Sequence, residues 1–364
     1  MADLQSVFRG CLLGLAVGDA MGYTVDSKNL EEIRADYGPN GLLGYDLVNG
    51  YADVTSYTQL AAFTANGLLL GLTRKHLQGR MAAPIKYIAL ALKEWARSQH
   101  YCEPERNYCW LSTIPQMKRR RCMDTWMLSM LSRQNLGTMA APVSRSDHPA
   151  PLTEALAIAL LGSKLELSQE ELNQLSAEAA ALTHGPDASL AAAALTYMFS
   201  RILENSSISM VDLVHDTMDA IQLQFGSTLN QTAALWELLL RAQSLASSEE
   251  LSPMDAMEQL SCRTAPEVLA GAVYACITSR GDFDTAMIIA VNHSGRSAAV
   301  GAVTGALLGA KLGFEALPDF YLESLEPTET LLELSEDLLH GCPAGFGGTF
   351  FDDDWDRKYL HAGQ

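Results

Sequence analysis

Residues 9–23 read RGCLLGLAVGDAMGY, an apolar run in which Gly14, Gly18 and Gly22 recur every four residues. Residues four apart lie on the same face of an α-helix, so these glycines leave one face of the helix flat. Because that face carries no side chains, the backbone of a neighbouring helix can approach it closely. The stretch therefore predicts a helix that packs tightly against a second helix.

A matching segment lies near the other end of the chain. Residues 298–312 carry Gly301, Gly305 and Gly309, again at intervals of four. This second glycine-faced helix is a suitable partner for the first. Their pairing would bring the N-terminal and C-terminal parts of the chain together in one core.

Helical periodicity dominates the remaining sequence. Apolar helices are predicted over residues 58–72, 83–97, 152–161, 188–203, 213–223 and 232–245. Capping-box patterns mark three helix starts, Ser168 with Glu171, Ser209 with Asp212 and Thr264 with Glu267. Strand signals are weak and flank residues 41–48. The sequence thus predicts an all-α fold, with one domain over residues 1–345 and an acidic, aromatic tail over residues 346–364, because no linker-like segment divides the chain.

The composition excludes several classes of protein. Of 364 residues, 48% are hydrophobic, which is enough for a large core, and the formal net charge is −18. Such a chain should repel nucleic acid and anionic membranes, since binding to phosphate draws on clustered Lys and Arg. The one basic run, residues 118–121, is interpreted as a solvated helix end.

Two further observations favour a cytoplasmic location. The seven cysteines are irregularly spaced and form no CxxC pair, so neither a disulfide framework nor a zinc site is indicated. The first apolar run is interrupted by Gly14, Gly18 and Asp19, which argues against a signal peptide or a membrane span.

Four separated segments carry motifs that belong together. They are residues 9–23 with YGPNGLLGYDLV at 37–48, TSYTQLAAFTANGLL at 55–69, RRRCMDTWMLSML at 119–131 with LTHG at 182–185, and AVNHSGRSAAVGAVTGALLGAKLG at 290–313. Their order and spacing resemble the bacterial ADP-ribosylglycohydrolases over nearly the whole chain. The resemblance implies a compact helical fold with a central cleft. It also implies two divalent cations, Mg²⁺ or Mn²⁺, which activate water for attack on the anomeric carbon of an ADP-ribosyl group.

This sequence departs from the family at the metal ligands. Where the family has Thr-Asp-Asp-Thr-Gln, residues 55–59 read TSYTQ, and where it has Asn-His-x-Gly-Asp-Ser-Asp, residues 292–298 read NHSGRSA. All the aspartates of both motifs are therefore replaced. The former ligand positions are Thr55, Ser56, Tyr57, Arg296 and Ala298.

The loss of these carboxylates has an electrostatic consequence. Mg²⁺ and Mn²⁺ are hard cations that depend on oxygen ligands, mainly carboxylates. Replacing four aspartates and adding Arg296 moves the site by about five charge units toward positive. A guanidinium roughly 4 Å away repels each unit of cationic charge by about 4 kcal/mol at an effective dielectric of 20. We therefore expect neither the metal pair nor another cofactor.

The same substitution suggests an anion site. A guanidinium suits bidentate contact with phosphate, so the cleft is predicted to hold ADP-ribose, a nucleotide or another small anion without metal. The predicted ligand-binding residues are Arg296, Ser297, Ser56, Tyr57, Thr55 and Asn292. In the alternative, Arg296 pairs with an acid such as Asp19 or Asp26 and fills the cleft.

Three residues are candidates for metal-independent catalysis. Asp19 in the GDAMG turn and Asp26 stand at positions that the resemblance places near the cleft. Asp19 could equally be a helix-end residue bonded to backbone. His184 in LTHG matches the first His of the family's Thr-His-Gly-His-Pro stretch, but Pro186 and Asp187 replace the last two residues.

Two other segments need separate interpretation. His148 lies in residues 147–151, DHPAP, where the family has a glycine-rich loop, and the sequence offers it no partner. Residues 281–285 read GDFDT, which is similar to a metal-binding motif of the family but does not stand at the position of that motif. Asp282 and Asp284 are two residues apart, so in a helix they would point about 200° apart and could not share an ion. Asp282 is predicted to be a helix N-cap.

The sequence therefore supports three hypotheses. In the first, the chain is a pseudoenzyme that binds an anionic ligand and acts through regulation or a protein partner. In the second, it is an ADP-ribosyl hydrolase with altered, metal-independent chemistry. In the third, the fold persists as a structural or oligomerising protein.

Overall fold

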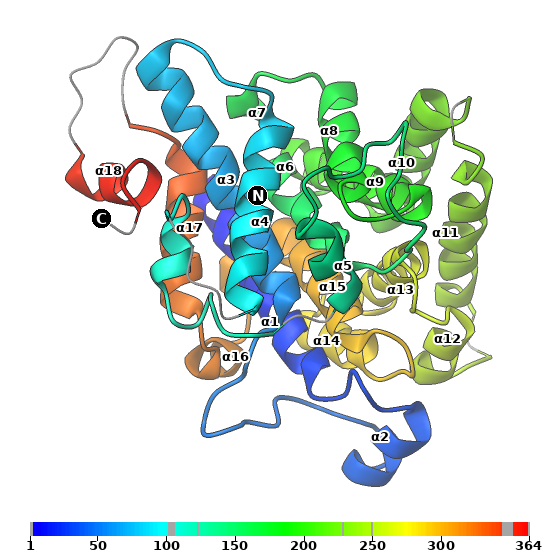
Figure 1. The fold of residues 1–364 in the computed structure, drawn as a ribbon. Helices are drawn as coiled ribbons and strands as arrows, with labels where there is room; N and C mark the ends of the chain where they lie inside the picture. The colour runs from blue at the N-terminus through cyan, green and yellow to red at the C-terminus, as the bar shows by residue number, and fades with distance from the viewer. Residues whose placement is uncertain are drawn as a thin grey trace.

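The computed structural model describes residues 3–100, 106–121, 124–227, 229–248, 250–343 and 352–362. Within these ranges the regular secondary structure is helical, with loops between the helices, and the chain is shown in Figure 1. The first half contains α1 (Leu4–Tyr23), α2 (Leu30–Tyr37), α3 (Ser56–Gln78), α4 (Pro84–Gln99), α5 (Thr125–Leu131), α6 (Glu154–Leu160), α7 (Gly162–Leu165) and α8 (Gln169–Ala181). The second half contains α9 (Pro186–Glu204), α10 (Met210–Phe225), α11 (Thr232–Ala246), α12 (Pro253–Gln259), α13 (Ala265–Thr278), α14 (Phe283–Val291), α15 (Ser297–Leu312), α16 (Asp319–Ser324), α17 (Thr328–His340) and α18 (Asp353–Tyr359). Short 3₁₀ turns are η1 (Trp110–Thr113), η2 (Ala150–Thr153) and η3 (Phe314–Ala316).

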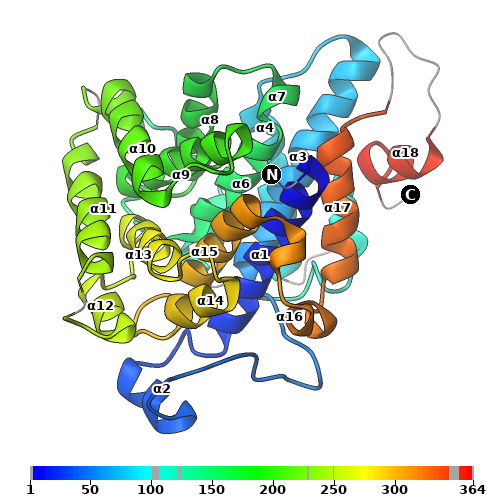
Figure 2. The same ribbon diagram turned by 180° about the vertical axis from the view of Figure 1, so that it is seen from behind.

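Helices α1 and α15 form the centre of the molecule, where they lie side by side in both views (Figures 1 and 2). A Cβ atom added to Gly14 would lie 2.2 Å from the carbonyl oxygen of Gly305, and one added to Gly10 would lie 2.4 Å from that of Gly309. At the other end, Gly22 faces the backbone of Ser297. The predicted pairing of glycine faces is therefore confirmed, and the two helices run antiparallel.

This antiparallel contact decides where the site lies. It sets the C-terminal end of α1 against the N-terminal end of α15, and the chain from α1 then returns to begin α3 at Ser56. The N-terminal ends of α3 and α15 are each hydrogen-bonded to an aspartate from α1 or the turn after it, as described below. Motifs that are more than 200 residues apart in sequence are thereby brought to one place.

The all-α prediction is confirmed, and each long helix predicted from periodicity lies within or overlaps an observed helix. The segments around residues 41–48 are extended loop. Within the described ranges they form no strand, and the β-type contacts are isolated bridges of Val48 with Tyr51 and of Ala52 with Leu325.

Two local predictions need correction. Ser209 caps α10 by accepting a hydrogen bond from the Asp212 N–H at 3.0 Å, but the Asp212 carboxylate accepts from the Ser209 hydroxyl and leaves the capping box incomplete. The basic run at 118–121 is not a helix end. It lies in turns after η1, where Arg121 pairs with Asp53 at 2.9 Å, because buried and half-buried acids need a cationic partner there.

The acidic, aromatic tail forms a helix that docks beside α3 and α17 at one edge of the molecule (Figure 2). Trp355 is 8% exposed and donates a hydrogen bond from its indole N–H to the Thr73 hydroxyl at 3.0 Å. The Tyr359 hydroxyl donates to Asp337 at 2.7 Å. Residues 344–351, which join the tail to α17, lie outside the described residues.

No described helix combines the length and the apolar character that crossing a bilayer requires. The five cysteines within the described ranges are free thiols. Four of them, Cys11, Cys109, Cys262 and Cys276, are buried.

Candidate functional site

The start of α3 is held by Asp19 of α1. Oδ1 of Asp19 accepts a hydrogen bond from the Thr55 hydroxyl at 2.6 Å, and Oδ2 accepts from the Thr55 N–H at 2.9 Å. Oδ2 also accepts from the N–H and the hydroxyl of Thr58, at 3.0 and 2.6 Å. Burial raises the pKa of Asp19 from 3.8 to about 6, although these hydrogen bonds lower it. Both carboxylate oxygens are engaged, so Asp19 ties α1 to α3.

The start of α15 is held in the same manner by Asp26. Oδ1 of Asp26 accepts a hydrogen bond from the Ala298 N–H at 2.9 Å, which satisfies one of the free donors at the helix N-terminus. Burial raises the pKa of Asp26 from 3.8 to about 6, while this hydrogen bond and the nearby charge of Arg296 lower it.

Arg296 is the residue that precedes α15, and its side chain is half-buried. Its N–H donates to the Cys262 carbonyl at 2.7 Å, which fixes the backbone. Its guanidinium forms no hydrogen bond and no ion pair with any described residue, including Asp19 and Asp26. The alternative in which Arg296 is neutralised by a direct pair with one of these acids is therefore not what the structure shows.

Tyr57 lies in the first turn of α3 and is fully buried. Its ring is nearly parallel to that of His148, with an interplanar angle of 7° and 6.4 Å between ring centroids. The Tyr57 hydroxyl and Nε2 of His148 are both buried without a hydrogen-bond partner among the described residues. Buried polar atoms are rarely left unpaired, so these two atoms mark a place suited to a polar ligand or water.

The other predicted ligand-binding residues have polar groups that are occupied within the protein. The Asn292 amide accepts from the Leu42 N–H at 2.7 Å and donates to the Leu42 carbonyl at 2.9 Å, which anchors the loop after α2. The Ser297 hydroxyl donates to the His293 carbonyl at 3.3 Å. The Thr55 hydroxyl is held by Asp19, as above. Ser56 is 1% exposed. Arg296 and Tyr57 are thus the predicted residues that retain unengaged polar groups.

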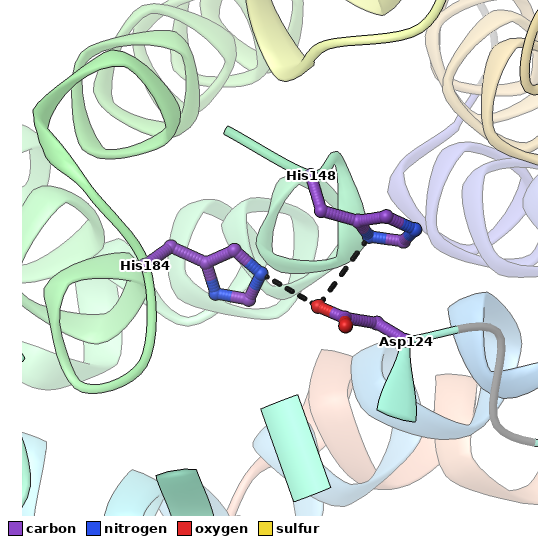
Figure 3. A group of neighbouring side chains, drawn as sticks. All are labelled: Asp124, His148 and His184. Carbon is purple, nitrogen blue, oxygen red and sulfur yellow. Dashed lines mark hydrogen bonds and ion pairs between the residues drawn. The ribbon is translucent and has the colours of Figure 1, made fainter. Parts of the chain in front are cut away.

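A second group of side chains lies beside Tyr57, and Figure 3 shows its geometry. Asp124 precedes α5, His148 lies in the loop before η2, and His184 follows α8. Oδ2 of Asp124 is 3.0 Å from Nε2 of His184 and 3.6 Å from Nδ1 of His148. The two imidazoles, from separate segments, therefore face the same carboxylate oxygen.

The protonation states in this cluster follow from its contacts. Burial raises the pKa of Asp124, but the hydrogen bond with His184 and the neighbouring imidazoles outweigh it, so the net pKa is below the usual value. Burial lowers the pKa of His148 from 6.5 to about 4, and the charge of Arg296 also lowers it, whereas Asp124 opposes the change. At neutral pH the cluster therefore contains a carboxylate and a neutral His148.

Hydrogen bonds show the structural roles of the remaining candidates from the sequence. Asp282 caps α14 by accepting from the Thr285 N–H at 2.7 Å, as predicted. Asp284 accepts from the Tyr321 hydroxyl at 2.7 Å, so the two acids of GDFDT do not converge. His184 lies at the cluster, but its partner Asp124 was not singled out from the sequence. The one local signal for Asp124 was its position before the apolar run of α5, which is typical of an N-cap.

Comparisons with known proteins agree with the motifs and the fold. The sequence model of the family described as ADP-ribosylglycohydrolase matches residues 1–345. An uncharacterized protein of Archaeoglobus fulgidus is 26% identical over 341 residues, which are 92% of this chain and 96% of that protein. A solved chain described as an ADP-ribosylglycohydrolase-related protein complex has a TM-score of 0.56 and 22% identity, and the match covers 93% of this chain and 99% of that one.

Proposed function

Because the chain belongs to the ADP-ribosylglycohydrolase family, we propose that it binds ADP-ribose or a related phosphate-bearing anion between the N-terminal ends of α3 and α15. We further propose that it does so without the family's pair of divalent cations, and that it does not hydrolyse the ligand through them. The observation that carries this proposal is Arg296, a half-buried guanidinium with no partner among the described residues, at a position where the family has an aspartate.

The residues at the former ligand positions do not fit a pair of hard cations. Ser56, Tyr57, Arg296 and Ala298 supply no carboxylate. The nearby acids, Asp19 and Asp26, use oxygens to hold the first turns of α3 and α15, so turning them toward an ion would release backbone donors. Since Mg²⁺ and Mn²⁺ depend on several oxygen ligands, this arrangement disfavours both.

Two of these residues, Arg296 and Tyr57, are suited to binding an anion. A phosphate at Arg296 would receive charge-assisted hydrogen bonds in a partly desolvated place, where such bonds are stronger than in water. The Tyr57 hydroxyl is a further donor that is fully buried and has no partner among the described residues. Because the charge of Arg296 lowers the pKa of Tyr57 against the larger effect of burial, the two groups are near each other and would offer a charge and a neutral donor to one ligand.

Metal-independent hydrolysis finds less support. Asp19 is committed to four hydrogen bonds, and both ring nitrogens of His184 are engaged, by Asp124 and by the Thr183 hydroxyl, so neither residue has a free atom for proton transfer. Asp26 keeps one oxygen without a described hydrogen bond and has a pKa of about 6, which would suit a proton-transferring group. It is the residue to replace if hydrolysis is observed.

Calorimetric titration with ADP-ribose tests the proposal. Wild-type protein is expected to bind, and Arg296→Ala is expected to lose at least about tenfold in affinity, the effect of one charge-assisted contact. The matched control is Arg80→Ala, since Arg80 is an exposed arginine outside the site. Arg296→Lys keeps the positive charge but lacks the planar guanidinium, so its affinity for ADP-ribose should lie between those of the wild type and Arg296→Ala.

The outcomes separate the three hypotheses. Binding that is lost in Arg296→Ala, with no release of ADP-ribose from an ADP-ribosylated protein, supports the proposal. Turnover in the presence of a chelator would replace it by the hydrolase with altered chemistry. No binding of ADP-ribose, nucleotides or inorganic phosphate would overturn it and leave the structural role.

A further inference from the structure

We propose that Asp124, His148 and His184 form a mononuclear site for a transition-metal ion of the zinc class. None of the three stands at a position where the family holds its cations, and the ligand chemistry is different. Two imidazoles and one carboxylate suit Zn²⁺, Co²⁺ or Fe²⁺, whereas Mg²⁺ prefers oxygen alone. The site does not depend on the proposed binding of ADP-ribose.

The distances in the cluster fit one small ion. Metal–nitrogen and metal–oxygen bonds of about 2.1 Å at tetrahedral angles place neighbouring ligand atoms about 3.4 Å apart. The observed separations, 3.0 Å from Oδ2 of Asp124 to Nε2 of His184 and 3.6 Å to Nδ1 of His148, lie on either side of this value. The candidate ligand atoms of the three residues all lie within 4.8 Å of one another. Small adjustments of the side chains would therefore surround an ion.

Neighbouring groups already orient two of the ligands. Oδ1 of Asp124 accepts hydrogen bonds from the N–H groups of Trp126 and Met127 at 2.9 and 3.2 Å, which turns Oδ2 toward the histidines. Nδ1 of His184 lies 2.7 Å from the Thr183 hydroxyl. Metal-bound histidines usually have such a partner on the second ring nitrogen, which fixes the ring and the tautomer.

The proton balance of the cluster also permits binding. Nδ1 of His148 accepts a hydrogen bond from the Ala150 N–H at 3.2 Å, so this nitrogen carries a lone pair that an ion could take over. When Nε2 of His184 binds an ion, its proton must move to Nδ1. There it would donate to the Thr183 hydroxyl.

The exposed fractions of the three side chains indicate the side from which an ion would reach them. The His148 side chain is 12% exposed, whereas those of Asp124 and His184 are 7% and 0% exposed, so access is from the His148 side. Three protein ligands leave at least one coordination position for water or a substrate atom. The Tyr57 ring lies beside His148, which places this metal site next to the proposed anion site.

Equilibrium dialysis of the metal-free full chain against Zn²⁺ gives the direct test. One Zn²⁺ per chain is expected, and Co²⁺ should bind with the visible absorption bands of a four-coordinate ion. His148→Gln, Asp124→Asn and His184→Asn should each weaken Zn²⁺ binding at least tenfold. The control is His215→Ala, since His215 is exposed on α10.

Two features keep the test decisive. His148→Gln replaces a loop residue, so a folded variant is expected, and circular dichroism checks each protein. Thr183→Val removes the partner of His184 without touching a ligand and should weaken Zn²⁺ binding by about tenfold or more. Absence of stoichiometric Zn²⁺ in the wild type, or unchanged Zn²⁺ affinity in folded His148→Gln, would overturn the proposal. Neither result depends on ADP-ribose binding.

Discussion

The carbonyl oxygen of Gly301 lies 1.9 Å from the point that a Cβ atom on Gly18 would occupy. No real Cβ makes such a contact, so even a methyl group would force α1 and α15 apart. Because the N-terminal end of α15 carries Arg296 and the C-terminal half of α1 carries Asp19, this contact also sets the geometry of the candidate site.

Gly18→Ala is therefore expected to destabilise the protein by about 3 kcal/mol, the upper range for overpacking, because both sides of the contact are backbone and cannot change rotamer. Urea denaturation followed by circular dichroism measures it. Gly44→Ala is the control, since a Cβ on Gly44 would meet nothing within 4 Å. Equal stabilities of the two variants would refute the close-packing argument.

Glu154 should make the stability of the protein depend on pH. It is 1% exposed, neither carboxylate oxygen has a hydrogen-bond partner among the described residues, and burial raises its pKa from 4.5 to about 8. Because the pKa is raised in the folded state, Glu154 is protonated in both the folded and the unfolded protein below about pH 4.5 and adds no pH dependence there. Its contribution then destabilises the fold progressively as pH rises to about 8.

The glutamine of Glu154→Gln stays neutral at every pH. Between pH 4.5 and 8, the free energy of unfolding of the wild type should therefore fall by about 4 kcal/mol more than that of the variant. Denaturation curves at several pH values measure the difference. Parallel pH profiles for the two proteins would show that Glu154 is ionised or solvated in the fold.

Trp355 should account for much of the docking of the tail helix. Trp355→Ala removes a buried indole and its hydrogen bond to Thr73, so a loss of about 3 kcal/mol is expected. Leu223→Ala is the control, because Leu223 is 89% exposed and its truncation should change stability by less than about 0.5 kcal/mol. Thermal unfolding that leaves the Trp355→Ala midpoint unchanged would show that the tail contributes no stability.

Restoring the family's carboxylates should restore binding of Mg²⁺. The combined variant Ser56→Asp, Tyr57→Asp, Arg296→Asp and Ala298→Asp regains four oxygen donors and loses the guanidinium, so Mg²⁺ should raise its thermal midpoint. Mg²⁺ is the appropriate probe, because it does not favour the histidines of the second cluster. A wild-type midpoint that rises equally with Mg²⁺ would contradict the prediction that the wild type does not hold the metal pair.

The fold could be predicted from the sequence because the central helix pair is marked by a short repeat within each helix. Glycines at intervals of four in residues 9–23 and 298–312 predict two flat helix faces, and periodicity predicts the helices around them. The N-cap role of Asp282 was also predictable, since capping depends on neighbouring residues alone. The basic run was misinterpreted because its acidic partner Asp53 lies far away in the sequence.

The candidate site was predictable in part. The motifs indicated that residues 55–57 and 296–298 would meet, but no sequence pattern reveals which polar groups remain unengaged. Asn292 proved to anchor the loop at Leu42, a contact across 250 residues. The convergence of Asp124, His148 and His184 depends on three loops whose approach is fixed by tertiary packing, so spacing carried no signal for it.

Metal-independent binding can be measured as the affinity of the wild-type protein for ADP-ribose, determined by calorimetry once in a chelator and once in excess Mg²⁺. Binding with the same dissociation constant is expected in both buffers. Binding that requires Mg²⁺, followed by release of heat from turnover, would contradict it.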